Sequence, residues 1–410
     1  MMTLTPELLE KTKNIGPVDI VVGICTKNVE ATIVHVMNVV ASGISEYFSD
    51  YNGLIIVSDG FSSDRTMELA EMFEPPGDIP KLLTEQMGGP GKGNGIRTIF
   101  EIASEMNSDT VVLIDGDLLS VRPEWIEHLG KPPIYGIADL VVPYYVRNIY
   151  DGPITKHIAY PLTRALYDVD IRQPIGGEFG LSIEFVRELL QHHHFPAHFG
   201  IDIFMTTTAA AEGRKIQETL LGLKLHESTI KYLDPAKHLS PMFMQVVGMI
   251  FDLMEHYECR WSEKPRIPET TSTMAKYHGQ KLAPLEVDID SLDRSFREGY
   301  TENRAFLEEN LDKELIEKLD YGAVKKPVHI GPELWSKLVF SMATAYKNTY
   351  DDEERQKVLE TLKSLWLGRF ASFVNETQGM EVEVAEKKLA ELAEIFKENM
   401  GYMNSLYCEI

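Results

Sequence analysis

The chain has 410 residues, of which 44% are hydrophobic and 25% are charged. These fractions are ordinary for a globular protein and exclude a disordered chain or a collagen-like fibre. Its 40 Lys and Arg residues against 63 Asp and Glu residues give a formal net charge of −23. Because a field of this sign repels phosphate backbones and anionic lipids, we expect no general binding to nucleic acid or to membrane surfaces.

The length and the cysteine content further limit the possible domain organisation and cellular setting of the chain. One hydrophobic core stops growing at roughly 250–300 residues, so we expect a large first domain, residues 1–260, and a smaller second region, residues 261–410. No apolar run reaches the roughly 20 residues that a membrane-spanning helix needs. The three cysteines lie far apart without metal-ligand spacing, which predicts a reducing, cytoplasmic setting rather than a disulfide framework.

The first half of the chain alternates short apolar runs with helix-like segments. The runs Val18–Ile24, Gly53–Val57 and Asp109–Ile114 are typical of strands buried in a parallel sheet. Helical patterns lie between them, over Ala31–Tyr47 and from Asp64 onward. This alternation predicts an α/β fold with an open, Rossmann-like sheet, in which ligands bind at the carboxyl ends of the strands.

The chain changes character after about residue 260. Arg266–Pro284 is rich in proline and polar residues, which indicates a linker or a loop. Three helical patterns follow, over Pro332–Lys347, Glu353–Thr377 and Glu381–Met400. We therefore expect the C-terminal region to be mainly helical.

The triplet Asp115-Gly116-Asp117 directly follows the last apolar strand. Two carboxylates at a sheet edge can bind a divalent cation, which in turn neutralises a diphosphate leaving group. Asp and Gly also form ordinary turns, so a turn alone stays an alternative. The position after the strand favours a metal and phosphate site.

A glycine-rich segment, Gly88–Gly95, contains Lys92 and runs into a helical stretch. Glycines let a backbone approach a ligand closely, and a helix start offers N–H groups to a phosphate. The segment is not a P-loop, because Gly93 stands where Ser or Thr would follow the lysine, and Pro90 interrupts a dinucleotide-binding pattern. A phosphate-binding loop is predicted, with a flexible connector as the alternative.

Three further segments combine polar residues with glycines: Arg172–Glu178, Gly200–Asp202 and Leu221–His226. Glu178 has no obvious partner in the sequence, and His226 ends an alternating, strand-like segment. An isolated histidine is usually structural, so on the sequence alone His226 is either a structural residue or a ligand.

Taken in chain order, these motifs resemble those of GT-A glycosyltransferases. More narrowly, they are similar to the retaining enzymes that make glucosyl-3-phosphoglycerate, glucosylglycerate or mannosylglycerate. The resemblance rests on seven segments, Thr26–Glu30, Ser58–Thr66, Gly89–Gly95, Asp115–Asp117, Gln173–Glu178, Gly200–Asp202 and Leu221–His226. Each is of low specificity, and seven in one order are a stronger indication. The resemblance implies a GT-A nucleotide-diphosphosugar transferase fold followed by a mainly helical region.

The resemblance also implies a metal and diphosphate site. Asp117 and His226 would bind Mg²⁺ or Mn²⁺, with Asp115 nearby on the nucleotide sugar. His238 is a rival for the histidine role, because the insertion before it blurs the register of the motif. Lys92 would be the cation on the diphosphate.

Further residues match positions that hold the donor and the acceptor in that family. Gly177 and Glu178 would bind the sugar, and Asp202 would lie beside the transferred sugar or the acceptor. Arg147 and Thr155 would clamp the acceptor carboxylate. The rest of the nucleotide sugar would be held by Thr26, Asn28, Glu30, Ser58, Asp59 and Gly116.

By this resemblance, the protein would move glucose or mannose from a UDP- or GDP-linked sugar to 3-phosphoglycerate or D-glycerate. Lys156 and Arg172 are candidates for binding an acceptor phosphate. The transfer would retain the configuration at the anomeric carbon. It would proceed by front-face attack, which we favour, or through a covalent intermediate on Asp202 or Glu178. The resemblance also suggests a homodimer.

Two other functions stay open on the sequence. A sugar-1-phosphate nucleotidyltransferase shares the sheet, the lysine loop and metal aspartates, but its loop normally follows the first strand, and here the loop comes two strands later. A non-catalytic protein that binds nucleotide sugars is the second alternative. It would be expected to lose the metal carboxylates or the lysine, and Asp115, Asp117 and Lys92 are all present.

Overall fold

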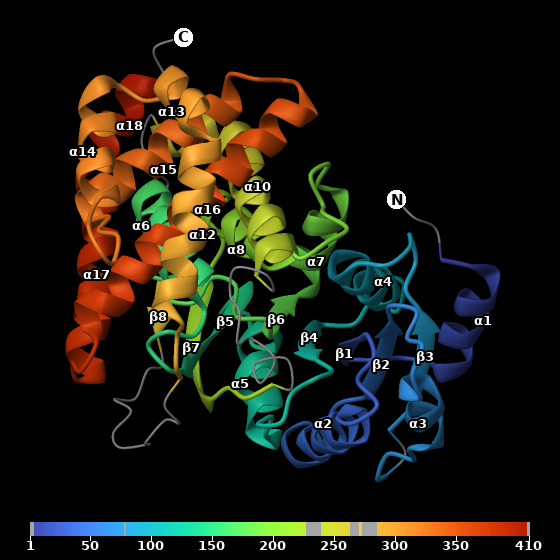
Figure 1. Ribbon diagram of the computed structural model, residues 1–410. Helices are drawn as coiled ribbons and strands as arrows, with labels where there is room; N and C mark the ends of the chain where they lie inside the picture. Colours follow the sequence, from blue (N-terminus) through green and yellow to red (C-terminus); the bar gives the residue numbers. More distant parts are fainter. Residues whose placement is uncertain (1–3, 78, 227–238, 263–269, 273–284, 408–410) are drawn as a thin grey trace. The chain divides into compact units, whose positions relative to one another are not determined.

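The computed structural model describes residues 4–77, 79–226, 239–262, 270–272 and 285–407. They belong to two compact units, each assembled from separate stretches of chain. The first unit comprises Met1–Val146, Ile175–Lys231 and Pro268–Gln280, and the second comprises Arg147–Pro174, Tyr232–Ile267 and Lys281–Ile410. A twisted sheet with helices forms the first unit, and helices dominate the described part of the second (Figure 1).

The first unit contains one eight-stranded sheet with the order β3-β2-β1-β4-β6-β5-β7-β8. Its strands are β1 (Ile20–Thr26), β2 (Gly53–Asp59), β3 (Lys81–Glu85), β4 (Thr110–Asp115), β5 (Leu140–Val146), β6 (Phe179–Ser182), β7 (Ile216–Leu223) and β8 (Thr270–Ser272). All neighbours pair in parallel except at β6, which runs antiparallel to both β4 and β5. The carboxyl ends of β1, β2, β4, β5 and β7 therefore lie at one edge, together with the amino end of β6.

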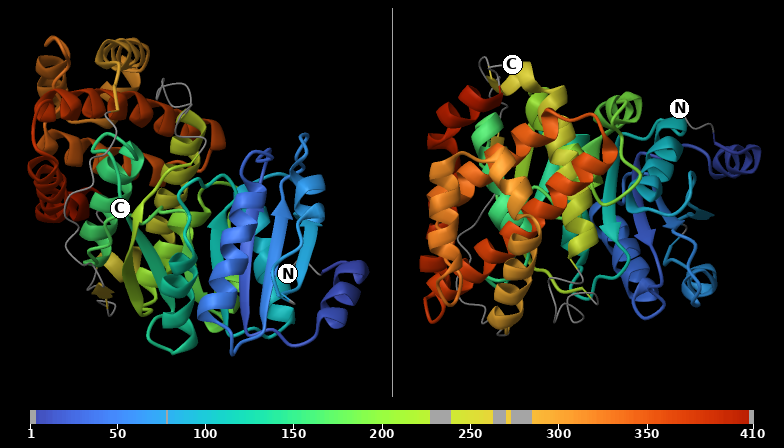
Figure 2. Two further views of the ribbon diagram at one scale, coloured as in Figure 1. Left: turned by 90° about the horizontal axis from the view of Figure 1, so that it is seen from below. Right: turned by 45° about the horizontal axis from the view of Figure 1, so that its top comes forward.

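Helices cover both faces of this sheet. The helices of the first unit are α1 (Pro6–Ile15), α2 (Ile33–Tyr47), α3 (Thr66–Met72), α4 (Lys92–Glu105), α5 (Pro123–Ile134), α7 (Ile183–Gln191) and α8 (Ile201–Ala211). Figures 1 and 2 show α2 and α5 along one face and α4 along the other. Close packing depends on glycines in the strands, because a Cβ on Gly23 would collide with Ile99 of α4 and one on Gly180 with the Leu129 carbonyl of α5.

The described part of the second unit is built from helices. They are the π-helix η1 (Thr155–Ala159), α6 (Tyr160–Tyr167), α10 (Ser240–His256), α11 (Glu258–Ser262), α12 (Ile289–Glu302), α13 (Arg304–Asn310), α14 (Lys313–Ala323), α15 (Pro332–Lys347), α16 (Asp352–Thr377), α17 (Val382–Glu398) and α18 (Met400–Tyr407). Helix α16 is the central one and packs against α10, α12 and α15. The indole N–H of buried Trp335 in α15 donates to the His157 carbonyl of η1, and that of buried Trp366 in α16 donates to the Pro153 carbonyl just before η1.

The fold class expected from the sequence, an α/β sheet followed by a mainly helical region, is confirmed. Predicted strands and helices are found within a few residues of their expected ends, and Pro332–Lys347 is found as predicted. The division of the chain differs from a boundary at residue 260, because residues 147–174 and 239–262 pack with the helical unit. Of the expected linker Arg266–Pro284, Thr270–Ser272 forms β8 at the sheet edge, and the other residues lie outside the described ones.

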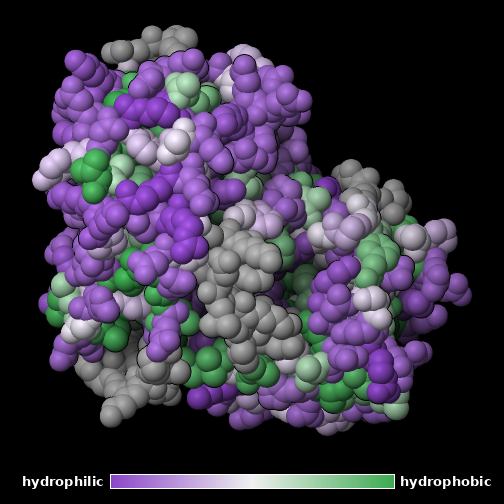
Figure 3. Space-filling view, in the orientation of Figure 1, coloured by the Kyte–Doolittle hydropathy of each residue, from purple (hydrophilic) through white to green (hydrophobic). Residues whose placement is uncertain are grey.

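Polar side chains dominate the face seen in Figure 3, and hydrophobic residues on it form small separate groups. This distribution agrees with the formal net charge of −23. None of the helices in the described part of the chain combines the length and the apolar character that a bilayer crossing needs.

Candidate functional site

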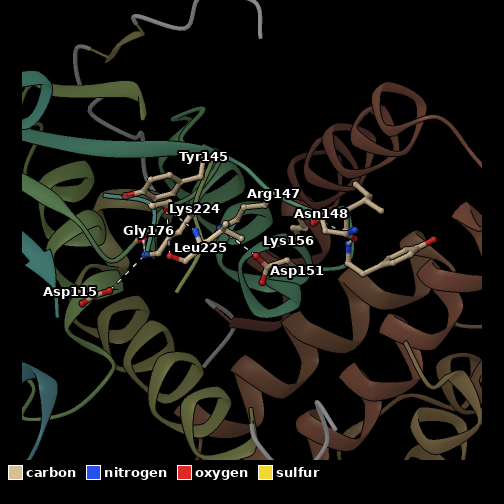
Figure 4. A network of polar contacts seen from close by, with 12 residues as sticks. Asp115, Tyr145, Arg147, Asn148, Asp151, Lys156, Gly176, Lys224 and Leu225 are labelled. Atoms are coloured by element: carbon tan, nitrogen blue, oxygen red, sulfur yellow. Dashed lines mark hydrogen bonds and ion pairs between the residues drawn. The ribbon is translucent and has the colours of Figure 1, made fainter. Parts of the chain in front are cut away.

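Charged side chains from three strands meet at the carboxyl edge of the sheet. Asp115 is the last residue of β4, Lys224 directly follows β7, and Glu178 directly precedes β6. Because β6 runs antiparallel to β4, the residue before it lies at the same edge as the residue that ends β4. Lys224 Nζ lies 3.6 Å from Asp115 Oδ2 (Figure 4). The same Nζ lies 2.7 Å from Glu178 Oε2.

Two helices add a second lysine and a third carboxylate. Lys92 is the first residue of α4, and Asp202 lies in the first turn of α8. Lys92 Nζ is 3.0 Å from Asp115 Oδ1 and 3.3 Å from Asp202 Oδ1. The structure thus brings together Lys92, Asp115 and Asp202, which stand in three separate motifs of the sequence.

The glycines around Lys92 have a packing role that the sequence did not indicate. A Cβ on Gly91 or Gly93 would collide with the backbone carbonyls of Ala197 and Pro196. The Asn94 N–H donates to the Ala197 carbonyl at 3.1 Å. These glycines therefore let the 196–198 segment lie against the start of α4, while the Lys92 side chain extends into the charged cluster.

Glu178 is enclosed by its partners. Its carboxylate is fully buried, and its oxygens accept hydrogen bonds from Lys224 at 2.7 and 3.0 Å and from the Tyr145 hydroxyl. Lys224 also donates to the Gly176 carbonyl at 2.8 Å. Gly177 has φ +98°, and a Cβ there would lie 2.6 Å from Asp115 Oδ2 and 2.7 Å from Lys224 Nζ. This turn therefore requires glycine both for its backbone conformation and for space.

Burial and the two lysines set the charges in the cluster. Burial raises the pKa of Glu178 to about 7 and outweighs the attraction of Lys224. Burial also raises the pKa of Asp202, against the pull of Lys92. For Asp115, burial opposes ionisation, but Lys92 and Lys224 together hold its pKa below the usual value. Burial likewise opposes the Lys92 cation, yet Asp115 and Asp202 keep its pKa well above the usual value. Lys92 and Asp115 are therefore both charged at neutral pH.

Asp117 and His226 lie beside each other next to this cluster. A bridge pairs Leu118 with His226, and the Leu119 N–H donates to the Leu225 carbonyl at 2.9 Å. This pairing brings His226 Nδ1 to 3.7 Å from Asp117 Oδ2. Two atoms that each lie about 2.1 Å from one cation can be up to about 4.2 Å apart, so the pair fits a shared divalent ion. His238, the rival for the histidine role, lies outside the described residues.

The residues expected to hold base and ribose connect the loops after β1 and β2. Asp59 accepts hydrogen bonds from the Thr26 hydroxyl at 2.8 Å and from the Ser62 backbone and hydroxyl. Asn28 Oδ1 accepts from the Ser63 N–H, and Glu30 Oε2 accepts from the Arg65 N–H. These contacts give Thr26, Asn28, Glu30 and Asp59 a structural part in shaping this edge. The buried Ser58 belongs to the same strand end.

Gly116, also expected on the nucleotide sugar, is constrained by packing. A Cβ at this position would lie 2.9 Å from the Cys25 carbonyl and 2.9 Å from Thr26 Cγ2. The Gly116 carbonyl accepts a hydrogen bond from Thr32 at 2.7 Å. The glycine between the two aspartates therefore lets the chain turn close to the end of β1.

The residues expected to bind the acceptor carboxylate, Arg147 and Thr155, belong to the second unit. They converge on Gly152, where a Cβ would lie 3.1 Å from Arg147 Nη1 and 3.6 Å from Thr155 Oγ1. Asp151 Oδ2 lies 3.6 Å from Arg147 Nε (Figure 4). The two residues that the resemblance assigns to the acceptor carboxylate therefore face the same point, and this role stays a prediction.

The sequence did not single out Lys224 or Tyr145 as members of the site. Lys224 stands inside the segment Leu221–His226, two residues before the histidine. In an extended chain this spacing puts both side chains on the same face, and that periodicity was the available signal. No local pattern marked Tyr145, because its role depends on β5 pairing beside β6.

No model of a known protein family matches the chain, and no curated protein sequence matches it. Solved structures of glucosyl-3-phosphoglycerate synthase from Mycobacterium tuberculosis are similar to it. The structure of that enzyme with phosphoglyceric acid has 26% identity, covers 63% of this chain and 86% of its own, and gives a TM-score of 0.45. The structure with Mg²⁺ and UDP has 26% identity, covers 62% and 84%, and gives a TM-score of 0.45. A third, with Mn²⁺, UDP-glucose and phosphoglyceric acid, has 24% identity, covers 63% and 86%, and gives a TM-score of 0.44.

Proposed function

We propose that the protein is a metal-dependent retaining glycosyltransferase. It would transfer glucose or mannose from a nucleoside-diphosphate sugar, UDP- or GDP-linked, to D-glycerate or 3-phosphoglycerate. The observation that carries this proposal is the meeting of Lys92, Asp115 and Asp202 at the carboxyl edge of the sheet. Open α/β sheets bind their ligands at this edge, and a buried cation there suits a diphosphate.

Lys92 is the residue that would neutralise negative charge on the diphosphate. Breaking the bond at the anomeric carbon places negative charge on the leaving phosphate oxygens, and a fixed cation stabilises that charge where it develops. Asp115 and Asp202 balance the charge of Lys92 in the structure. Binding of the donor would therefore exchange carboxylate partners of Lys92 for phosphate oxygens.

Asp117 and His226 are the residues that would hold Mg²⁺ or Mn²⁺, because their donor atoms lie within reach of one ion. The bound ion supplies further positive charge for the diphosphate. Asp115 contacts two lysines instead, so we assign it to keeping Lys92 and Lys224 in place.

Asp202 and Glu178 differ as candidates for a covalent intermediate. Both oxygens of Glu178 accept hydrogen bonds inside the protein, so we assign it to positioning Lys224 and the turn at Gly177. Asp202 lies beside Lys92, next to the expected diphosphate. We favour front-face attack, in which the acceptor oxygen bonds to the anomeric carbon as the phosphate leaves, and the phosphate takes the acceptor proton. A glycosylated Asp202 detected by mass spectrometry after slow turnover would contradict this mechanism.

Replacing the two key side chains tests the proposal. Asp117→Asn and Lys92→Ala should each lower kcat by about 10²–10³-fold, the usual effect of losing one electrostatic stabiliser. Lys131→Ala serves as the control, because this lysine pairs with Glu127 on the surface of α5. Circular dichroism would check that each variant is folded.

The product of the reaction distinguishes transfer of sugar from transfer of nucleotide. A nucleoside diphosphate is expected, and its release should stop with a chelator and return with Mg²⁺ or Mn²⁺. Release of pyrophosphate would indicate a nucleotidyltransferase instead. Unchanged turnover in both Asp117→Asn and Lys92→Ala would contradict the proposed site. The homodimer and the cytoplasmic location stay predictions.

A further inference from the structure

A second group of charged residues lies around η1 in the helical unit. Glu386 of α17 places Oε2 at 2.8 Å from Arg172 Nη2 and Oε1 at 3.9 Å from Lys156 Nζ. Lys156 and Arg172 are the two cations that the sequence offered for an acceptor phosphate. One carboxylate of the protein therefore pairs with both of them.

Lys156 is fixed in place by the backbone. Its buried ammonium group donates hydrogen bonds to the Asn148 carbonyl (Figure 4) and to the Ile149 carbonyl, both at 2.9 Å. An ammonium group has three N–H donors, so these two contacts leave one for Glu386. Burial lowers the pKa of Lys156 despite the attraction of Glu386. The two backbone contacts hold the ammonium group in place, and Glu386 is the carboxylate beside it.

Arg172 is held from two sides. Its guanidinium carbon lies 4.9 Å from the centre of the Tyr160 ring, and the Tyr160 hydroxyl donates to Asp170 at 2.8 Å. Its Nη2 donates to Glu386. A stacked, paired arginine is a rigid element, and its charge is compensated by the carboxylate of α17.

Arg147 and Thr155 face a common point at Gly152. Asp151 Oδ2 lies 3.6 Å from Nε of Arg147, whereas the atom of Arg147 that faces Gly152 is Nη1. A single carboxylate carries one negative charge and suits one arginine with one hydroxyl. A phosphate monoester carries about −1.5 to −2 charges at pH 7 and would need further cations. Those cations are the ones that Glu386 neutralises.

We propose that Glu386 sets the acceptor specificity of the protein, because it supplies an internal counter-ion to Lys156 and Arg172 and so excludes a phosphorylated acceptor. The acceptor would be a small hydroxy acid with one carboxylate and no phosphate, bound by Arg147 and Thr155. This inference rests on the proposed function for the existence of an acceptor. It selects D-glycerate rather than 3-phosphoglycerate.

The test compares wild type, Glu386→Gln and Glu394→Gln with D-glycerate and with 3-phosphoglycerate, using the same sugar donor. Glutamine keeps the size of the side chain and removes its charge. Glu394 is the matched control, because it lies on the same helix and pairs with an arginine, Arg164, outside the group around Glu386. Circular dichroism confirms folding of each variant.

Wild type should show the higher kcat/KM with D-glycerate. In Glu386→Gln, the ratio of kcat/KM for 3-phosphoglycerate to that for D-glycerate should rise at least tenfold, through a lower KM for the phosphorylated acid. Glu394→Gln should keep the wild-type ratio. A wild-type preference for 3-phosphoglycerate, or an unchanged ratio in Glu386→Gln, would overturn the inference.

Calorimetric titration of both acids separates this inference from the proposed function. If wild type binds D-glycerate more tightly and Glu386→Gln shifts binding toward 3-phosphoglycerate while no sugar is transferred, the selectivity stands and the transferase proposal fails. If sugar is transferred but the two acids bind equally well to wild type, the transferase stands and the role of Glu386 fails.

Discussion

Removing the ammonium group of Lys224 should destabilise the first unit by several kcal/mol. Lys224 compensates the fully buried Glu178 through hydrogen bonds of 2.7 and 3.0 Å. Loss of one partner of a buried ion pair costs about 3–5 kcal/mol, because the remaining group must either stay charged without compensation or take up a proton. Lys224→Met keeps most of the aliphatic chain and removes the charge. We expect a loss of stability in this range at pH 8.

The same substitution should cost less at pH 6. Burial raises the pKa of wild-type Glu178 to about 7 even with Lys224 present, and without the lysine the carboxyl would hold its proton above pH 8. An acid whose pKa is raised by folding makes the folded state less stable as pH rises through that pKa. Between pH 6 and pH 8 the wild type releases this proton and the variant keeps it. The penalty of the substitution should therefore grow by about 1.4 kcal/mol over this interval.

Hydrogen exchange followed by mass spectrometry, in increasing urea, would measure this stability in peptides that cover β5 and β6. The double variant Lys224→Met/Glu178→Gln should recover part of the loss, because glutamine is neutral without having to take up a proton. Lys215→Met is the matched control, since Lys215 directly precedes β7 and Lys224 directly follows it. A Lys224→Met protein as stable as wild type at pH 8 would refute this reasoning, and so would a double variant no more stable than the single one.

Two further substitutions test other parts of the molecule. His157 is buried against Phe370 and Phe373, neither ring nitrogen has a hydrogen-bond partner among the described residues, and burial holds its pKa well below the usual value. Below about pH 6.5 the unfolded chain therefore takes up a proton that the folded one does not. As pH falls from 7 to 5, this group should lower the free energy of unfolding by up to about 1.4 kcal/mol per pH unit. Urea unfolding at each pH would measure this contribution. It should be absent in His157→Leu and retained when exposed His35 is replaced instead. Gly177→Ala should lower kcat at least tenfold, because its Cβ would press on Asp115 and Lys224; equal kcat for wild type and variant would show that this turn does not position the site.

The sequence singled out most of the charged residues that meet at the sheet edge, but not how they are paired. Asp115 and Lys92 were recognised because each stands in a short pattern, an aspartate after an apolar strand and a lysine among glycines. The reason for the glycines was missed, since Gly91 and Gly93 are required by the 196–198 segment, about 100 positions later in the chain. Glu386 was missed altogether, because its charge on α17 is typical of a solvent-exposed helix face until η1 packs nearby.

The antiparallel strand β6 explains why such pairings are hard to predict. In a fully parallel sheet, only residues that follow strands gather at the carboxyl edge, and Asp115 and Lys224 obey this rule. Glu178 precedes its strand and would lie at the opposite edge if β6 were parallel. The reversal at β6 brings it to Lys224, and the same strand lies beside β5, which carries Tyr145. A single strand direction, which no local pattern specifies, thus decides whether Glu178 is a lone charge or the partner that fixes Lys224 beside Asp115.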